Sequence, residues 1–124
     1  MITGAIQSDE ARIRLKVKGL RGREQEVEAV IDTGYTGTLT LPPVLMASLG
    51  LRWRSVDSAT LGDGSTCVFR VFVGKVVWDG KVRSILVHEA GGDPLVGMRL
   101  LRGCELKMQV RARGKVTIKR LPPS

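Results

Sequence analysis

The sequence predicts a mainly β protein, a closed or folded-over β-barrel with one or two short helices. Strand-like stretches recur about every eight to twelve residues, and turn signals separate them. Fifteen glycines supply many of these turns, and only two short segments have the pattern of a helix. No internal repeat or low-complexity linker interrupts the 124 residues, so residues 1–124 are expected to form a single domain.

The first predicted strand covers residues 13–17, where apolar residues alternate with single charged ones. A turn at residues 19–22 leads to a second strand, Glu24–Ile31, which runs directly into Asp32. A short third strand is expected at residues 38–41. The second strand therefore delivers a carboxylate into the turn that follows it.

Proline and glycine mark the limits of the first predicted helix. Pro42 and Pro43 begin a helical turn that runs through Leu49, and Gly50 lies just past its end, where glycine is common. Residues 52–59 are again expected to be extended.

The second half of the chain has the pattern of successive hairpins. Residues 61–65, with the sequence Leu-Gly-Asp-Gly-Ser, have the composition of a tight hairpin tip. The elements expected after it are strands at residues 68–73 and 75–78, a two-residue turn at Asp79-Gly80, a strand at 81–88, a loop at 91–94, a short helix at 97–102 stopped by Gly103, and a last hairpin of residues 106–110 and 115–118.

The second strand ends in the tripeptide Asp32-Thr33-Gly34. A semi-buried carboxylate is costly unless its neighbours hold it, and the Thr33 hydroxyl and backbone N–H groups of the turn can do so. Taken alone, the tripeptide also fits a surface Asx-turn between strands. The residues that follow favour a functional site over a surface turn, because a second glycine, Gly37, precedes a short strand that ends at Pro42.

The segment from Ala29 to Pro42 resembles the active-site loop of the aspartic proteases. It is most similar to the retropepsin-like group, the small single-domain bacterial relatives of the retroviral proteases. Leu95-Val96-Gly97 resembles the element that packs beneath the catalytic loop in that family, and the resemblance covers roughly residues 11–118. One departure is Tyr35, which stands where the family usually has Ser or Ala.

The resemblance implies an aspartic endopeptidase with Asp32, Thr33 and Gly34 in its catalytic loop. The chemistry needs two carboxylates that share one proton, and this chain has one Asp-Thr-Gly. The other aspartates in turns, Asp63, Asp79 and Asp93, stand in sequences of a different form. An active enzyme must therefore be a homodimer, in which Thr33 is expected to bond across the two-fold axis. We expect an acidic optimum, with activity lost once both carboxylates ionise.

The resemblance also implies a substrate site. The hairpin tip of Leu61, Gly62, Asp63 and Gly64 occupies the place of the flap that closes over bound substrate, and Tyr35 is assigned to the same substrate-binding set. The expected substrate is an extended protein or peptide with apolar side chains flanking the cut. No cofactor and no metal are expected. A phosphate cradle at the tip is not favoured, because the acidic residue would repel phosphate.

Two other functions remain open. The first is a dimeric peptide-binding module of the same fold that cleaves little or nothing. The second is a basic barrel that binds nucleic acid, which the net charge of +8 suggests. Only the C-terminal third is densely basic, and no aromatic residues interleave with its charges, so no nucleic-acid partner is expected. Those charges are Lys107, Arg111, Arg113, Lys115, Lys119 and Arg120.

Some residue types carry weaker predictions. No signal segment and no apolar run of membrane-spanning length is visible, so we expect a cytoplasmic protein without a membrane partner. Cys67 and Cys104 fit no zinc spacing and are expected to be buried small hydrophobes rather than a disulfide. His88 is the single histidine and is expected to be structural.

Overall fold

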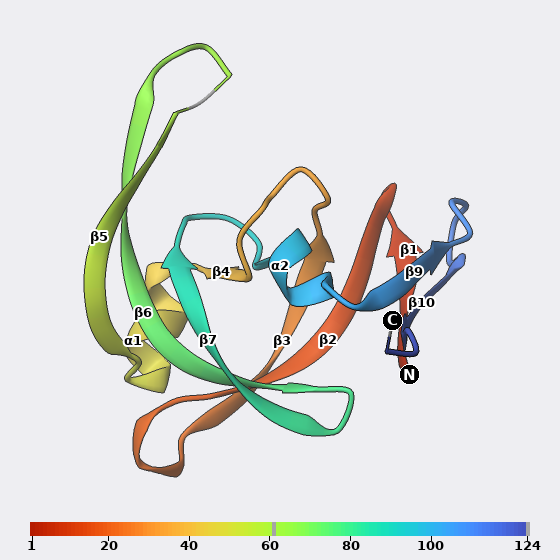
Figure 1. Cartoon of the computed structure of the whole chain (residues 1–124), viewed down its shortest axis with the longest axis horizontal. Coiled ribbons are helices and arrows are strands. Elements are labelled where there is room, and N and C mark those ends of the chain that lie inside the picture. Colours follow the sequence, from red (N-terminus) through yellow and green to blue (C-terminus); the bar gives the residue numbers. More distant parts are fainter. Residues whose placement is uncertain (61, 124) are drawn as a thin grey trace.

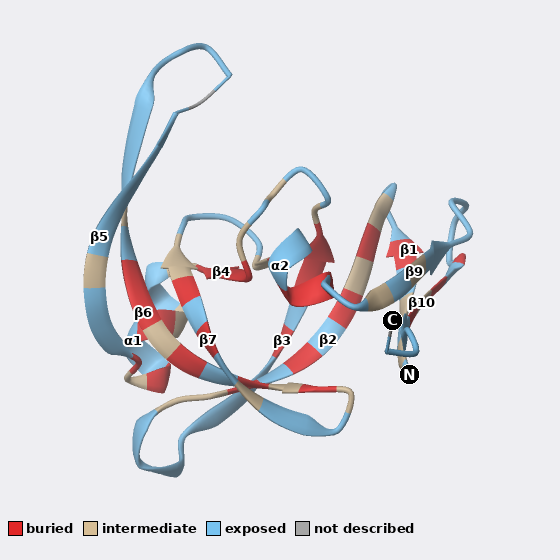
Figure 2. Cartoon of the chain, in the orientation of Figure 1, coloured by how far each residue is buried: buried red, intermediate tan, exposed pale blue. Residues whose placement is uncertain are grey.

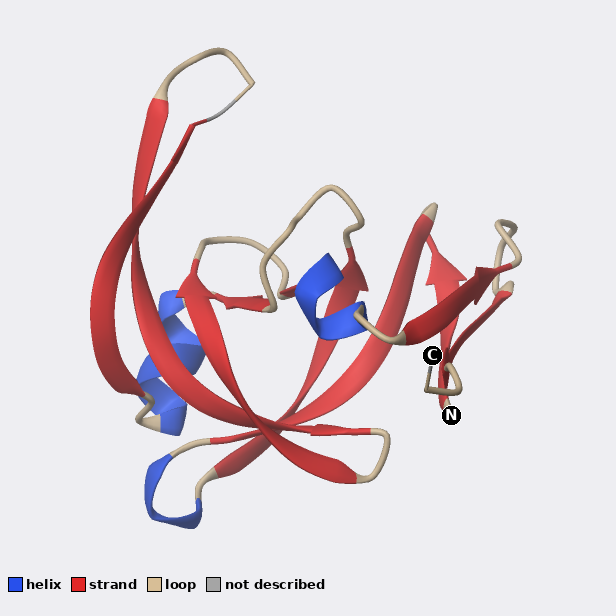
Figure 3. Ribbon diagram, viewed as in Figure 1, coloured by secondary structure: helices blue, strands red, loops and turns tan. Residues whose placement is uncertain are grey.

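The computed structural model of the protein describes residues 1–60 and 62–123. Within these residues the chain forms ten strands, two short α-helices and one 3-10 turn, shown in Figure 3. The elements are β1 (Ile2–Gln7), β2 (Glu10–Lys18), η1 (Leu20–Gly22), β3 (Glu24–Ile31), β4 (Leu39–Leu41), α1 (Pro43–Leu49), β5 (Arg52–Thr60), β6 (Thr66–Trp78), β7 (Lys81–Glu89), β8 (Leu95–Val96), α2 (Met98–Leu101), β9 (Cys104–Met108) and β10 (Lys115–Arg120). The prediction of a mainly β protein is confirmed.

All the strands belong to one sheet, in the order β5-β6-β7-β4-β8-β3-β2-β1-β10-β9. The sheet bends back on itself because β6 also pairs with β2, where Val17 lies opposite Val76. The strands from β6 through β2 thus form a ring, visible at the centre of Figure 1, with β5 outside it at one end and β1, β10 and β9 at the other. The ring is not a clear barrel, since the pairing of β2 with β6 is short.

Alternation in β2 fixes which side of the sheet faces the core. Ile13, Leu15 and Val17 are almost completely buried, as the sequence predicts. The cations between them lie outside and face the glutamates of β3: Arg14 is 3.6 Å from Glu26. The alternation predicted for this strand is therefore confirmed, and the glutamates of β3 neutralise much of the charge on its outer face.

The helix α1 packs at one side of the ring and ends as predicted, with Gly50 in the left-handed region at φ 63°. Met46 and Leu49 turn into the core, which also contains Leu39, Val76 and Val87. Figure 2 shows that this buried material lies in the ring, whereas the outer half of the β5–β6 hairpin is exposed along its length.

The hairpin of β5 and β6 stands apart from the rest of the fold. We call its outer part, residues 55–60 and 62–70, the projecting hairpin; Figure 1 shows it rising well beyond the ring. The loop between β3 and β4, residues 32–38, projects toward the same end of the molecule and is called here the Asp32 loop. The fold therefore places an exposed hairpin and a carboxylate-bearing loop on one side.

Several sequence predictions need correction. Strand β1 was not predicted, and β9 covers Cys104–Met108 instead of residues 106–110. The strands expected at 68–73 and 75–78 are one continuous strand, since Gly74 lies inside β6 and its missing side chain leaves room for Leu51.

The cysteine prediction was half right. Both thiols are free, but Cys67 is exposed on the projecting hairpin and Cys104 is only partly buried. Neither is the fully buried hydrophobe that was expected. Within the described residues, neither helix has the length and apolar character needed to cross a membrane.

Candidate active site

Asp32 lies immediately after the last residue of β3 and is half-buried, as predicted. Its Oδ1 accepts a hydrogen bond of 2.9 Å from the backbone N–H of Gly34, and its carbonyl accepts one of 3.1 Å from Tyr35 N–H. The first bond confirms the predicted role of the turn in holding the carboxylate. Thr33 is exposed, and its hydroxyl makes no hydrogen bond within the described part of the chain.

The two arms of the Asp32 loop are held together by β8. This short strand runs parallel to β3 and antiparallel to β4, so that Val96 lies between Ile31 and Leu39. Val96 is completely buried, and its carbonyl accepts the N–H of Asp32 at 2.9 Å. Leu95-Val96-Gly97 thus lies directly beneath the loop, where the sequence analysis expects it.

Backbone hydrogen bonds from the start of α2 continue this support. Gly97 N–H donates to Thr38 O at 3.0 Å, and Met98 N–H donates to Tyr35 O at 2.8 Å. Arg99 N–H donates to Gly37 O at 3.1 Å. A further bond of 2.9 Å joins the N–H of Leu95 to the hydroxyl of the buried Thr40. Most carbonyls of the loop are therefore engaged, which restricts its backbone.

Gly97 is required by this close approach. A Cβ at position 97 would overlap the carbonyl oxygen of Gly37 and the ring of Tyr35. We expect Gly97→Ala to lower the free energy of unfolding by about 1–3 kcal/mol, the usual cost of overpacking. Gly91→Ala is the matched control, because a Cβ there meets nothing within 4 Å and the backbone is not in the left-handed region. Urea denaturation measures the free energy of unfolding of both variants. Equal losses in Gly97→Ala and Gly91→Ala would contradict the requirement for glycine at position 97.

Tyr35 is half-buried and turns toward β7. Its hydroxyl lies 2.7 Å from Nδ1 of His88, and their rings meet edge to face with centroids 5.9 Å apart. Burial raises the pKa of Tyr35 to about 12, so the phenol stays protonated at ordinary pH. The residue that departs from the family pattern is therefore part of a polar pair, which sequence reasoning missed. The only available signal was that Tyr35 and His88 are each single in the chain.

The pKa of His88 is lowered by burial, and Asp57 partly opposes the shift. Because the folded protein disfavours the protonated ring, the contribution of His88 to stability is complete above its unfolded pKa of about 6.5 and is lost as the pH falls through the lowered folded value. We expect the urea midpoint of the wild type to fall with acidification more than that of His88→Gln in this window. Parallel pH profiles would contradict the assignment.

The projecting hairpin carries the predicted substrate-binding tip. Gly62, Asp63 and Gly64 are exposed at the tip, while Leu61 lies outside the described residues. Asp63 accepts hydrogen bonds from the hydroxyl and N–H of Ser65, which lower the pKa of Asp63. At the base of the hairpin, Arg70 forms two bonds with Glu89 of β7, at 2.9 and 2.6 Å.

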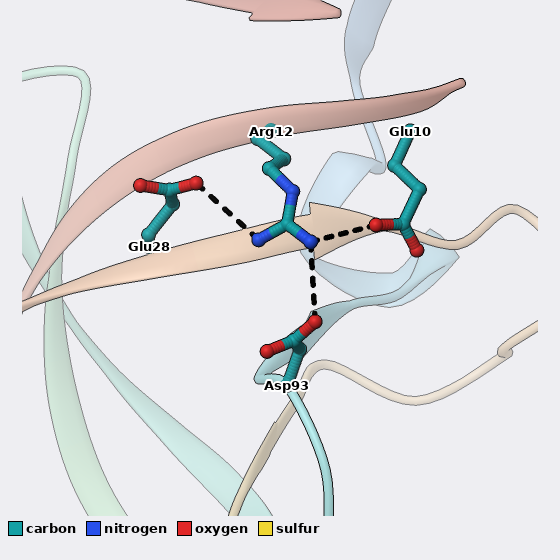
Figure 4. Close-up of polar contacts among 4 residues, drawn as sticks. All are labelled: Glu10, Arg12, Glu28 and Asp93. Atoms are coloured by element: carbon teal, nitrogen blue, oxygen red, sulfur yellow. Dashed lines mark hydrogen bonds and ion pairs between the residues drawn. The ribbon is translucent and has the colours of Figure 1, made fainter. Parts of the chain in front are cut away.

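Arg12 secures the loop that leads into β8 (Figure 4). Its Nη2 lies 2.6 Å from Glu10 and 3.2 Å from Asp93, and its Nη1 lies 3.3 Å from Glu28. The side chain is mostly covered, whereas its acidic partners are more open. Next to this cluster, Val30 N–H donates to Pro94 O at 2.9 Å. Arg12 therefore helps to fix the segment that carries Leu95 and Val96 to their place.

Within the part of the chain that the structure describes, the residues that could support a metal site or a nucleic-acid site are not gathered around the Asp32 loop. Among residues 1–60 and 62–123, no three potential ligands from His, Cys, Asp and Glu lie close enough together to hold a metal ion. The basic residues of the C-terminal third are exposed on and around β9 and β10, away from the Asp32 loop in Figure 1. The structure thus brings together Asp32, Tyr35 and Leu95-Val96-Gly97. It leaves the hairpin tip standing apart.

Comparison with models of known protein families finds no match, and comparison with curated proteins finds none either. The mainly β fold and the geometry around Asp32 are accordingly the basis for any functional assignment.

Proposed function

We propose that this protein is a homodimeric aspartic endopeptidase with a retropepsin-like fold, in which each chain supplies one Asp32. The observation that carries the proposal is the way in which backbone hydrogen bonds from Gly34 and Val96 hold the Asp32 loop. A half-buried carboxylate follows a core strand, its Oδ1 is held by Gly34 N–H, and its backbone N–H is fixed by Val96. Such anchoring suits a group that has to meet a symmetry mate in a defined geometry.

The proposed reaction uses the two carboxylates in different protonation states. Two like charges about 3 Å apart cannot both ionise, so the pair shares one proton. The ionised Asp32 takes a proton from a water held between the pair, and the water oxygen attacks the scissile carbonyl. The protonated Asp32 of the other chain donates its proton to the carbonyl oxygen, which gives a tetrahedral diol. The C–N bond then breaks as its nitrogen takes the proton that the first Asp32 removed from water, and a diol hydroxyl returns a proton to the other Asp32. Exposed Thr33 and Gly34 leave the loop surface open to a second copy.

The geometry of the projecting hairpin supports the proposal that the substrate is an extended peptide. The hairpin is long and exposed, and it rises on the same side of the fold as the Asp32 loop (Figure 1). An extended peptide can add to such a hairpin as a further strand, with its side chains alternating between two faces. We propose that closure of this hairpin over the loop covers the scissile bond and excludes water.

The test is incubation of the protein with a diverse peptide pool between about pH 3 and pH 7, with the products read by mass spectrometry. The proposal expects internal cuts between apolar residues and a maximum rate at acidic pH. No cleavage at any pH by a folded dimer would overturn it. Cleavage only at chain ends would replace the endopeptidase with an exopeptidase.

One observation favours a second function, a dimeric peptide-binding module that does not cleave. Tyr35 stands where the family has a small residue, and its ring passes close to Gly37 and Gly97. A bulky ring beside the loop can reduce the space for a substrate at the carboxylate. Capture of uncut peptides from the same pool, unchanged by Asp32→Asn, would support this alternative.

A further inference from the structure

Three rings connect the Asp32 loop to the projecting hairpin. Tyr35 belongs to the loop, His88 lies near the end of β7, and Phe69 lies on β6. The Tyr35 hydroxyl is 2.7 Å from His88 Nδ1, and the rings of His88 and Phe69 have centroids 4.8 Å apart with an interplanar angle of 48°. A continuous line of contacts therefore runs from Tyr35, three residues after Asp32, through His88 to Phe69 of the projecting hairpin.

His88 is placed where the two parts meet. In the sheet it lies opposite Val71 of β6 on one side and beside Thr40 of β4 on the other. The strand β6 continues into the projecting hairpin, whereas β4 is the strand into which the Asp32 loop returns. His88 therefore lies between the strand that continues into the projecting hairpin and the strand into which the Asp32 loop returns.

The hydrogen bond with Tyr35 is the main polar contact of the His88 side chain. On β5, Asp57 lies opposite Phe69 in the sheet, and its charge favours the protonated His88 ring. The neighbouring Glu89 is occupied by Arg70. Burial favours the neutral ring of His88, and in the tautomer that carries its proton on Nε2 the Nδ1 atom accepts the hydrogen bond that the Tyr35 hydroxyl donates. Protonation of the ring would reverse the direction of that bond.

We propose that Tyr35 and His88 are positioning residues that couple the order of the Asp32 loop to the position of the projecting hairpin. The role of this coupling in closure over a substrate rests on the proposed function. The physical link between the loop and the hairpin does not depend on it. When the hairpin moves, Phe69 shifts against His88, and the hydrogen bond carries the shift to the loop. Substrate held by the hairpin thus orders the segment that carries the carboxylate.

Hydrogen exchange of the backbone amides tests the link without any substrate. The proteins are the wild type, Tyr35→Phe, His88→Leu and the double variant, with Ser48→Ala as the control. Ser48 of α1 also makes a side-chain hydrogen bond, to Gln25 of β3, and this bond involves neither the Asp32 loop nor the projecting hairpin. Each single variant is expected to speed exchange about 5- to 10-fold in both the loop and the hairpin, the amount that one lost hydrogen bond allows.

Non-additivity is the decisive result. The double variant is expected to exchange no faster than either single variant, because both remove the same bond. His88→Gln is expected to restore part of the protection, since its amide oxygen can accept from Tyr35. Multiplied effects in the double variant, or a change confined to one of the two segments, would overturn the coupling. Should Tyr35→Phe not fold, the test uses His88→Leu and His88→Gln. Faster exchange in both segments of His88→Leu, with partial recovery in His88→Gln, would support the coupling, and faster exchange in one segment alone would overturn it.

Substrate kinetics separate this inference from the proposed function. If the protein cleaves peptides, Tyr35→Phe is expected to raise KM more than it lowers kcat, because the carboxylate itself is intact. If cleavage is found but exchange in the loop does not follow the hairpin, the coupling fails and the peptidase stands. If no cleavage is found but exchange is coupled, the peptidase fails and the link stands.

Discussion

Replacing Asp32 by Asn is expected to abolish the proposed peptide hydrolysis and to leave the folded, proposed dimer intact. An amide in the same place keeps the shape of the side chain, and its oxygen can still accept the hydrogen bond from Gly34 N–H. It cannot take a proton from water or share one with its mate. General acid–base groups contribute about 10²- to 10⁴-fold, so the rate is expected to fall by at least about 10³-fold in a site that loses both.

The matched control for this substitution is Asp9→Asn. Asp9 is an exposed aspartate in the turn between β1 and β2, and its φ of 62° is one that asparagine also adopts readily. This control removes the same charge without touching the Asp32 loop or the substrate-binding tip. Cleavage rates and sedimentation are compared for both variants. Full hydrolysis by folded Asp32→Asn would end the assignment, and equal losses in both variants would show an effect of charge alone.

Dilution is expected to abolish the proposed peptidase activity. A chain with one Asp-Thr-Gly supplies only half of the proposed site, so a separated monomer has no partner for its carboxylate. Well below the dissociation constant of the dimer, each tenfold dilution should lower the activity per chain by nearly tenfold. The separated monomer is expected to stay folded and to show a cooperative unfolding transition, because Val96 and its neighbours are buried within one chain.

The measurement is the initial rate over a series of protein concentrations, with the dimer fraction followed by sedimentation. A joined pair of chains, linked through a flexible spacer, is the control, since its effective local concentration does not fall on dilution. An activity per chain that stays constant while the dimer separates would mean that one chain holds a complete site.

Strong local signals made several of the individual strands and the end of α1 predictable. Alternation in β2 and the glycine after α1 correctly indicated these elements, because burial of one strand face and the left-handed position of Gly50 act locally. Strand β1 was missed because its turn has no glycine: Ser8 and Asp9 both have positive φ, which sequence rules assign mainly to Asn and Gly. Gly74 misled for the opposite reason, as it fills a packing need inside a strand.

The site was predictable only in its local part. Asp32, the turn at Gly34 and the element at Leu95-Val96-Gly97 follow from short motifs, and the structure brings them into contact. The bond between Tyr35 and His88 joins residues that are far apart in sequence, and no local pattern signals such a pair. The contact of Arg12 with Asp93 was hidden for the same reason, because it depends on how β2 and the loop before β8 meet in space.

The central claim is that two Asp32 carboxylates, one from each chain, form a single site. Wild type and Asp32→Asn are unfolded together in varied ratios, refolded so that the chains mix at random, and assayed on one peptide. If both carboxylates are needed, activity follows the square of the wild-type fraction, and an equal mixture keeps about a quarter of the wild-type rate. A linear decrease, with about half of the rate retained in the equal mixture, would contradict the shared site.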